Sequence, residues 1–217
     1  MRVIITGATG LVGEGVLLVG LNRPEVTEVL TITRKPSEHK HPKLKELIVK
    51  DFSEIKNYSA ELNGYDACFF CAGASSVGET EESFTRKTYD FVLPFAEELS
   101  RINKAMTFIY VSGNRTDSTE KGKVMWARVK GRTENALLKL PFKAVYNFRP
   151  GFMRPVKEQK NVRFIYRFFD VLSPVWYLLF PGWICKMEEV GLAMIHCVEK
   201  GYKNTVMEVK DIKEAAR

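Results

Sequence analysis

Three glycines near the start of the chain have the spacing that a phosphate-binding turn requires. The segment reads Thr6-Gly7-Ala8-Thr9-Gly10-Leu11-Val12-Gly13, and it lies between a strand-like and a helix-like run. In such a turn the first glycine adopts backbone angles that a Cβ disfavours. The second glycine lets the main chain approach a pyrophosphate, and the third lets the helix pack closely on the strand. The phosphates bind at the helix N-terminus, where free N–H groups favour negative charge.

This order of strand, glycine turn and helix favours a dinucleotide site over an ordinary tight turn, which is the alternative interpretation. The residues expected to contact the cofactor here are Gly7, Thr9, Gly10, Leu11, Val12 and Gly13. The net charge of +7 also suits an anionic ligand, although many basic proteins bind nothing acidic.

The residues after the second predicted strand indicate which dinucleotide would bind. In the dinucleotide fold this strand end meets the adenosine ribose, where an acidic residue accepts the 2′-hydroxyl of NAD and an arginine pairs with the 2′-phosphate of NADP. The chain has Arg34 and Lys35 at this point and no acidic residue. We therefore expect NADP to be preferred to NAD. The alternative is a solvated basic loop, because more lysines follow.

A further contact with the cofactor is expected after the third strand, at Asp51 and Phe52. Both residues would lie beside the adenine, with Asp51 accepting a hydrogen bond from an amine or a backbone donor. The alternative is that Asp51 caps the following turn, a common role for aspartate.

The elements that must position these residues alternate between strands and helices. Strands are predicted at Val3–Thr6, Val29–Thr33, Glu46–Lys50, Ala67–Cys71, Thr107–Ser112 and Ala144–Phe148. Helices are predicted at Leu11–Leu21, Glu79–Arg101 and Val124–Leu140. Strands without internal alternation of apolar and polar residues are typical of a parallel sheet that is covered on both faces. The sequence thus predicts a doubly wound α/β fold of the Rossmann type, in a single domain over residues 1–217.

Residues 152–217 are expected to form a small C-terminal cap on the substrate side of this domain. The stretch 162–185 is unusually aromatic. Its longest uncharged run is shorter than the ~20 residues of a membrane-spanning helix, and Pro174 and Pro181 interrupt it. We interpret the stretch as a cap that packs on the sheet and lines a pocket. A surface that binds a membrane or a protein partner is the alternative.

The composition disfavours several other kinds of protein. The four cysteines form no disulfide pattern, and Cys68 and Cys71 would point to opposite faces of a strand, unlike a zinc or redox pair. The histidines have no cluster of acidic or cysteine ligands, so we expect no metal site. The basic stretch 34–50 lacks interleaved aromatics, so we expect no nucleic-acid partner. The chain starts without a signal peptide, which predicts a cytoplasmic location.

Five stretches of the chain together resemble the extended and atypical short-chain dehydrogenase/reductases. They are the glycine turn, Cys71-Ala72-Gly73, Tyr110-Val111-Ser112, Trp126-Ala127-Arg128-Val129-Lys130-Gly131 and Arg149-Pro150-Gly151. The likeness spans nearly the whole chain and is greatest to the small Tat-interacting-protein-like branch. Members of that branch are described loosely as NAD-dependent epimerase/dehydratase or nucleoside-diphosphate-sugar epimerase-like proteins. The resemblance implies that Cys71-Ala72-Gly73 passes over the cofactor and that Pro150-Gly151 lies beside the nicotinamide.

The resemblance also implies a catalytic set, in which one residue departs from the family pattern. The family uses Tyr-x-x-x-Lys on a helix together with a serine from the preceding strand end. The lysine binds the ribose and lowers the pKa of the tyrosine, which transfers the proton. Here Ser112 and Lys130 occupy the matching positions, but Trp126 replaces the tyrosine. An indole has one N–H donor and cannot act as a general acid or base near neutral pH.

Three functions are therefore open. The protein is an NADP(H)-dependent oxidoreductase or epimerase-like enzyme for an unidentified small molecule, with water, Ser112 or another residue moving the proton. Alternatively, it binds NADP(H) without turnover as a redox sensor, or it keeps the fold as a protein-interaction scaffold. The resemblance also implies pairing into a homodimer through the two helices that flank the active site.

Overall fold

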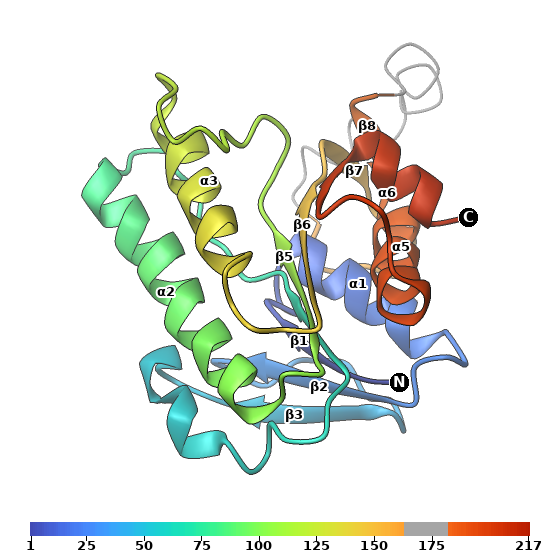
Figure 1. The fold of residues 1–217 in the computed structure, drawn as a ribbon. Helices are drawn as coiled ribbons and strands as arrows, with labels where there is room; N and C mark the ends of the chain where they lie inside the picture. The colour runs from blue at the N-terminus through green and yellow to red at the C-terminus, as the bar shows by residue number, and fades with distance from the viewer. Residues whose placement is uncertain (163–181) are drawn as a thin grey trace.

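The centre of the protein is a parallel sheet of seven strands, seen in a computed structural model that describes residues 1–162 and 182–217 (Figure 1). The strands are β1 (Arg2–Thr6), β2 (Glu28–Thr33), β3 (Leu44–Ile48), β4 (Ala67–Phe70), β5 (Thr107–Val111), β6 (Ala144–Arg149) and β9 (Val206–Glu208). Their order in the sheet is β3-β2-β1-β4-β5-β6-β9. The order changes direction between β1 and β4, and folds of this kind bind ligands at the carboxyl ends of the strands beside such a point.

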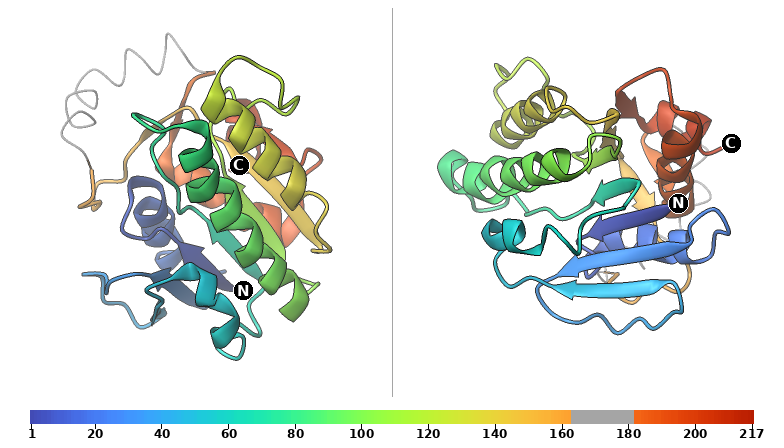
Figure 2. Two further views of the ribbon diagram at one scale, coloured as in Figure 1. Left: turned by 90° about the vertical axis from the view of Figure 1, so that its left-hand side faces the viewer. Right: turned by 60° about the horizontal axis from the view of Figure 1, so that its bottom comes forward.

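Helices cover both faces of this sheet. They are α1 (Leu11–Leu21), α2 (Glu81–Ile102), α3 (Met125–Leu137), α5 (Met187–Lys200) and α6 (Val209–Ala215), with a 3-10 helix η1 (Phe52–Tyr58). Figure 1 and Figure 2 show α2 and α3 on one face and α1, α5 and α6 on the other. The predicted doubly wound α/β fold is thereby confirmed.

The strands are apolar at successive positions because both faces of the sheet are buried. On β1, Val3 and Ile5 belong to the core beneath α1, whereas Ile4 belongs to the core beneath α2. All three side chains are fully buried. A strand with one face in water would alternate apolar and polar residues, so the observed pattern follows from the doubly covered sheet.

The elements predicted up to residue 149 agree with the structure apart from shifts at their ends. The helix predicted at Leu11–Leu21 has these same bounds, and the strand predicted over residues 46–50 is β3. Helix α2 begins only at Glu81, because the Thr80 hydroxyl caps it by accepting a hydrogen bond from Ser83 N at 3.2 Å.

The described part of residues 152–217 does more than cap the domain. Strand β9 pairs in parallel with β6 and completes the main sheet, and α5 packs against α1. The short strands β7 (Phe152–Arg154) and β8 (Ile184–Lys186) form a separate two-stranded sheet. Strand β9 and helix α5 therefore belong to the Rossmann core, and a cap on the substrate side stays a prediction.

The aromatic stretch 162–185 is represented in the structure by Trp183. Its exposed ring contacts the Arg115 guanidinium, whose Cζ lies 4.5 Å from the ring centroid. Residues 163–181, which carry the other aromatics of the stretch, lie outside the described residues. Among the helices that the structure describes, none has the length and hydropathy needed to span a bilayer.

Candidate functional site

Backbone contacts require glycine at two positions of the turn between β1 and α1. Gly7 has a φ of +70°, and a Cβ there would lie 2.7 Å from the backbone N of Ala72. A Cβ on Gly13 would lie 2.1 Å from the backbone O of Gly7. Gly10 N donates a hydrogen bond to the same oxygen at 2.8 Å. The turn is therefore held close to both the β4 end and α1, as a phosphate-binding turn requires.

The N-terminus of α1 is open to an anion. Gly10 is the N-cap residue in an extended conformation, and no described side chain caps the helix. The neighbouring Thr9 is exposed, and Leu11 and Val12 are half-buried. A helix whose first N–H groups lack a side-chain acceptor, preceded by a turn of glycines, fits the pyrophosphate of a dinucleotide.

A cavity of about 800 Å³ extends from the glycine turn to the loop after β2. Its described lining residues are Ala8, Thr9, Arg34, Lys35, Pro36, Ser37, Glu38, His39, Lys160 and Asn161. Arg34 and Lys35 are exposed, and neither side chain pairs with another described residue. The structure thus places both predicted basic residues in the same cavity as the turn.

The segment after β4, Cys71-Ala72-Gly73, lies against the turn. Ala72 N donates to Thr6 Oγ1 at 3.1 Å, which ties the segment to the end of β1. A Cβ on Gly73 would meet no described atom within 4 Å. Burial raises the pKa of the Cys71 thiol to about 12, so this thiol stays protonated and brings no charge to the turn.

Asp51 and Phe52 have clear structural roles. Asp51 caps η1, with Oδ1 accepting from Ser53 N at 2.9 Å, and this hydrogen bond holds the pKa of Asp51 below its usual value. The buried Phe52 ring packs on Phe91, with ring centroids 4.9 Å apart. Neither is among the described residues that line the cavity. The capping alternative thus describes Asp51, and contact with adenine stays a prediction.

Trp126 and Lys130 lie four residues apart near the N-terminus of α3. Lys130 Nζ donates a hydrogen bond to the backbone O of Ser112, just after β5. Burial lowers the pKa of Lys130 from 10.5 to about 8, and the nearby Glu134 carboxylate opposes this effect. The lysine can therefore exchange a proton close to neutral pH, whereas the half-buried indole of Trp126 cannot.

The Ser112 hydroxyl is bonded inside the protein. Ser112 Oγ donates to Glu134 Oε1 at 2.5 Å and lies 3.2 Å from the backbone O of Phe148, and the side chain is buried. Because a hydroxyl has one proton to donate, Ser112 in this arrangement has none left for a substrate oxygen. The hydroxyl connects the end of β5 to α3, and a catalytic role for Ser112 stays a prediction.

A buried ion pair between α3 and β6 is a feature that the sequence analysis missed. Glu134 and Arg149 form a fork, with Nε–Oε1 and Nη2–Oε2 distances of 3.0 and 2.5 Å. Arg149 Nη1 also lies 3.1 Å from Glu208 Oε1 on β9, and Nη2 lies 2.5 Å from Ser118 Oγ. The one signal in the sequence was the position of Glu134 one helical turn after Lys130. These charges join α3, β6 and β9 at the carboxyl edge of the sheet.

Pro150 and Gly151 connect the end of β6 to two other segments. Asn114 N donates to Pro150 O at 3.0 Å. A Cβ on Gly151 would lie 2.0 Å from Trp183 O, and the same oxygen accepts from Phe152 N at 2.8 Å. Backbone packing against Trp183 thus requires glycine here, and contact with a nicotinamide stays a prediction.

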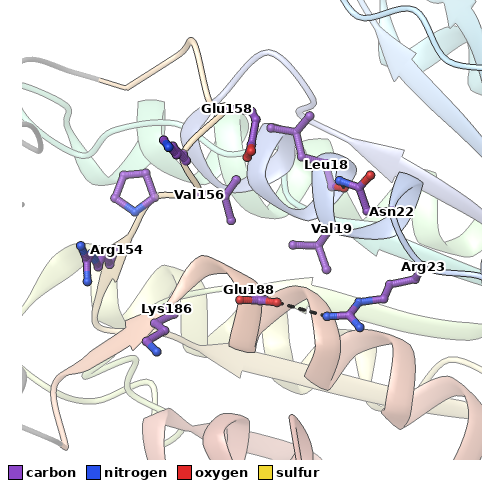
Figure 3. A pocket seen from close by; sticks show the side chains of 11 residues that line it. Leu18, Val19, Asn22, Arg23, Arg154, Val156, Glu158, Lys186 and Glu188 are labelled. Carbon is purple, nitrogen blue, oxygen red and sulfur yellow. Dashed lines mark hydrogen bonds and ion pairs between the residues drawn. The ribbon is translucent and has the colours of Figure 1, made fainter.

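A second hollow, of about 780 Å³, lies between α1, residues 154–158 and the start of α5 (Figure 3). Two of its lining residues, Arg23 and Glu188, form an ion pair with Nη2 and Oε1 3.1 Å apart. None of the predicted site residues is among its described lining residues, so this hollow is separate from the candidate site.

The sheet order and the open helix N-terminus place the protein among the Rossmann dinucleotide-binding proteins, the class that includes the short-chain dehydrogenase/reductases. The model of the NAD dependent epimerase/dehydratase family matches residues 3–119, which is more than half of the chain. The chain belongs to that family, and the resemblance inferred from its motifs is confirmed.

Fungal proteins are among the sequence relatives. "Protein fmp52, mitochondrial" of Emericella nidulans is 25% identical over 214 residues, which cover 94% of this chain and 90% of the relative. "Leucinostatins biosynthesis cluster protein T" of Purpureocillium lilacinum is 29% identical over 143 residues, which cover 64% of this chain and 52% of the relative. The names of several Fmp52 relatives, which call them mitochondrial, contradict the expected cytoplasmic location. That expectation depended on the first residues of the sequence alone, and it is withdrawn.

Solved structures with the same fold include two enzymes that act on nucleotide sugars by name. The dTDP-glucose 4,6-dehydratase DesIV of Streptomyces venezuelae, solved with NAD bound, has a TM-score of 0.69 at 16% identity and is covered to 75%, with 96% of this chain matched. The UDP-N-acetylglucosamine 4-epimerase of Bacillus cereus has a TM-score of 0.68 at 14% identity and is covered to 83%, with 99% of this chain matched. At such identities the likeness shows a shared fold and not a shared reaction.

Proposed function

We propose that this chain binds NADP(H) and acts as an oxidoreductase or nucleoside-diphosphate-sugar epimerase-like member of its family, with Trp126 in place of the catalytic tyrosine. The observation that carries the proposal is the cavity that joins the glycine turn to Arg34 and Lys35. An arginine at the end of β2 pairs with the 2′-phosphate that distinguishes NADP from NAD.

The chain's own residues would hold the dinucleotide along the carboxyl edge of the sheet. The glycine turn and the first N–H groups of α1 would bind the pyrophosphate. The remaining contacts would come from Arg34 and Lys35 to the 2′-phosphate, Asp51-Phe52 to the adenine, Lys130 to the ribose, and Cys71-Ala72-Gly73 and Pro150-Gly151 to the nicotinamide side.

A bound nicotinamide supplies or accepts a hydride, and the protein must then move a proton. Trp126 cannot do so, and the Ser112 proton is already donated to Glu134. Lys130 is suited to the task because burial lowers its pKa to about 8, so that both protonation states are populated near neutral pH. We assign the proton transfer to Lys130. Its ammonium would give a proton to the substrate oxygen when the carbonyl carbon is reduced, and its amine would take one in the reverse direction.

A second function, NADP(H) binding without turnover, is favoured by Trp126 and Ser112. The tyrosine position holds Trp126, and the Ser112 hydroxyl is bonded to Glu134. A redox sensor needs the cofactor cavity but no proton transfer, so these departures would not impair it.

Two measurements on the full chain test these proposals. Isothermal titration calorimetry should show saturable binding of NADPH and NADH, tighter for NADPH. Consumption of NADPH across a panel of carbonyl compounds should then exceed background for the wild type and fall in Lys130→Met. Binding with no turnover on any compound would support the redox sensor. Flat titrations with both nucleotides would contradict both functions, and a protein-interaction scaffold would be the remaining alternative.

A further inference from the structure

Residues 159–161 are fixed against α1 by buried polar contacts, although they lie far from the glycine turn in the sequence. The Glu14 carboxylate is fully buried, and its Oε1 and Oε2 accept from Lys160 N at 3.0 Å and from Asn161 N at 2.8 Å. Gln159 Nε2 donates to the backbone O of Leu11 at 2.7 Å. Breaking these bonds would remove partners from a buried carboxylate, so α1 determines where this segment lies.

The same carboxylate holds the loop after β2. His39 Nε2 lies 3.0 Å from Glu14 Oε1. The loop and residues 160–161 are therefore attached to one buried side chain, and both line the 800 Å³ cavity together with Ala8 and Thr9 of the glycine turn. This arrangement brings Lys160 to the cavity that contains Arg34.

The cavity is predominantly basic. Apart from His39, its described charged lining residues are the cations Arg34, Lys35 and Lys160 and the acid Glu38. Lys160 Nζ pairs with Glu38 Oε2 at 3.2 Å, and the two side chains are 58% and 81% exposed. So exposed an ion pair contributes little stability, which means that a more highly charged anion can take the place of Glu38.

We infer that Lys160 is a third cation for the 2′-phosphate of NADP(H) and thereby helps to determine the preference for NADP over NAD. The inference rests on the proposed binding of NADP(H). On ligand binding, Lys160 exchanges the Glu38 carboxylate for a phosphate dianion, which forms the stronger charge-assisted hydrogen bond. Glu38 repels the same phosphate, so Lys160 and Glu38 act on binding with opposite signs.

The first test compares adenosine 2′,5′-bisphosphate with AMP, two nucleotides that differ by the 2′-phosphate, in calorimetric titrations of the full chain. Lys160→Ala should weaken binding of the bisphosphate about fivefold to tenfold and leave AMP unchanged, because one hydrogen bond to a charged group is lost. Lys157→Ala is the matched control. Lys157 is exposed on the same segment but lines the second hollow, so both affinities should be unchanged.

The second test removes the negative charge of Glu38, which is expected to oppose phosphate binding. Glu38→Gln should strengthen binding of the bisphosphate about twofold to threefold and leave AMP unchanged, because a neutral amide replaces the repelling carboxylate. Both single-residue effects should shrink as salt is added, since exposed charges are screened.

The outcomes separate this inference from the function on which it rests. If the wild type prefers the bisphosphate and Lys160→Ala keeps that preference in full, or loses affinity for both nucleotides equally, the role of Lys160 is overturned while NADP(H) binding stands. If the wild type binds the bisphosphate no better than AMP, the NADP preference and the role of Lys160 are overturned together.

Discussion

The glycine turn and the α3 end of the candidate site lie at the carboxyl edge of one sheet, but the shape of the first depends on backbone contacts and that of the second on charged side chains. At the turn, the backbone sets the shape, since a Cβ on Gly7 or Gly13 would collide with main-chain atoms. At α3, charged side chains set the shape, through the buried pair of Glu134 and Arg149 beside Lys130. The first region has the glycines and the uncapped helix end that fit a dinucleotide, whereas the second has Trp126 where the family resemblance implies a tyrosine. Binding and proton transfer can therefore be tested, and can fail, independently of each other.

The largest effect is expected from breaking the ion pair at the α3 end. Arg149→Met leaves the Glu134 carboxylate buried without its cation and should lower the free energy of unfolding by about 3–5 kcal/mol, measured in urea. Arg23→Met is the matched control, because the Arg23–Glu188 pair is partly exposed, and it should cost less than about 1 kcal/mol. Equal losses in the two variants would show that burial does not increase the contribution of the Glu134–Arg149 pair to the free energy of unfolding.

At the glycine turn, the corresponding change is Gly13→Ala. The new Cβ would lie 2.1 Å from Gly7 O, so the helix must move away from the turn. We expect a loss of about 1–3 kcal/mol in the free energy of unfolding and loss of NADPH binding in calorimetry. Gly20→Ala on the same helix is the control. Its Cβ would find Val29 at 4.0 Å, and alanine should stabilise the helix by up to about 1 kcal/mol. Wild-type stability and affinity in Gly13→Ala would contradict the described turn.

Lys130 permits a test by pH. Burial lowers its pKa from 10.5 to about 8 on folding, so between these values the unfolded chain binds more protons than the folded protein. Stability from this group therefore rises with pH across that window, by up to about 1.4 kcal/mol per pH unit. Because the buried thiols, whose pKa values burial raises, have the opposite pH dependence, the test is a difference between variants. Between about pH 8 and about pH 10, thermal unfolding should show that the wild type and the exposed-lysine control Lys104→Met gain stability relative to Lys130→Met. If all three proteins change in parallel, Lys130 is not the buried amine described here.

The smallest expected effect concerns the contact between Arg34 and the 2′-phosphate of NADPH. Arg34→Ala should weaken NADPH about tenfold and leave NADH nearly unchanged, because only NADPH has the 2′-phosphate. Lys40→Ala removes an exposed charge from the same loop outside the cavity and should affect neither nucleotide. Titration calorimetry measures the affinities of the wild type and of both variants for each nucleotide. Equal losses for NADPH and NADH in Arg34→Ala would refute the proposed role of Arg34.

The contrast between the two regions also explains how much the sequence could predict. The turn and α1 are specified by residue types within one short segment, and Leu11–Leu21 was predicted with its observed bounds. The bond from Ser112 to Glu134 joins two elements whose packing no local pattern reveals. Strands β7, β8 and β9 have three residues each and gain their pairing from distant partners, so they give no periodic signal. The role of the buried Glu14 was missed for the same reason, because its backbone partners at Lys160 and Asn161 lie more than a hundred residues away.

The central claim is that the turn between β1 and α1 binds the pyrophosphate of a dinucleotide. Crystals of the full chain grown with saturating NADPH test it most directly. We predict phosphate density against the N–H groups of residues 11–13, with the 2′-phosphate beside Arg34. NADPH bound elsewhere on the protein, with the turn holding only solvent, would contradict the claim.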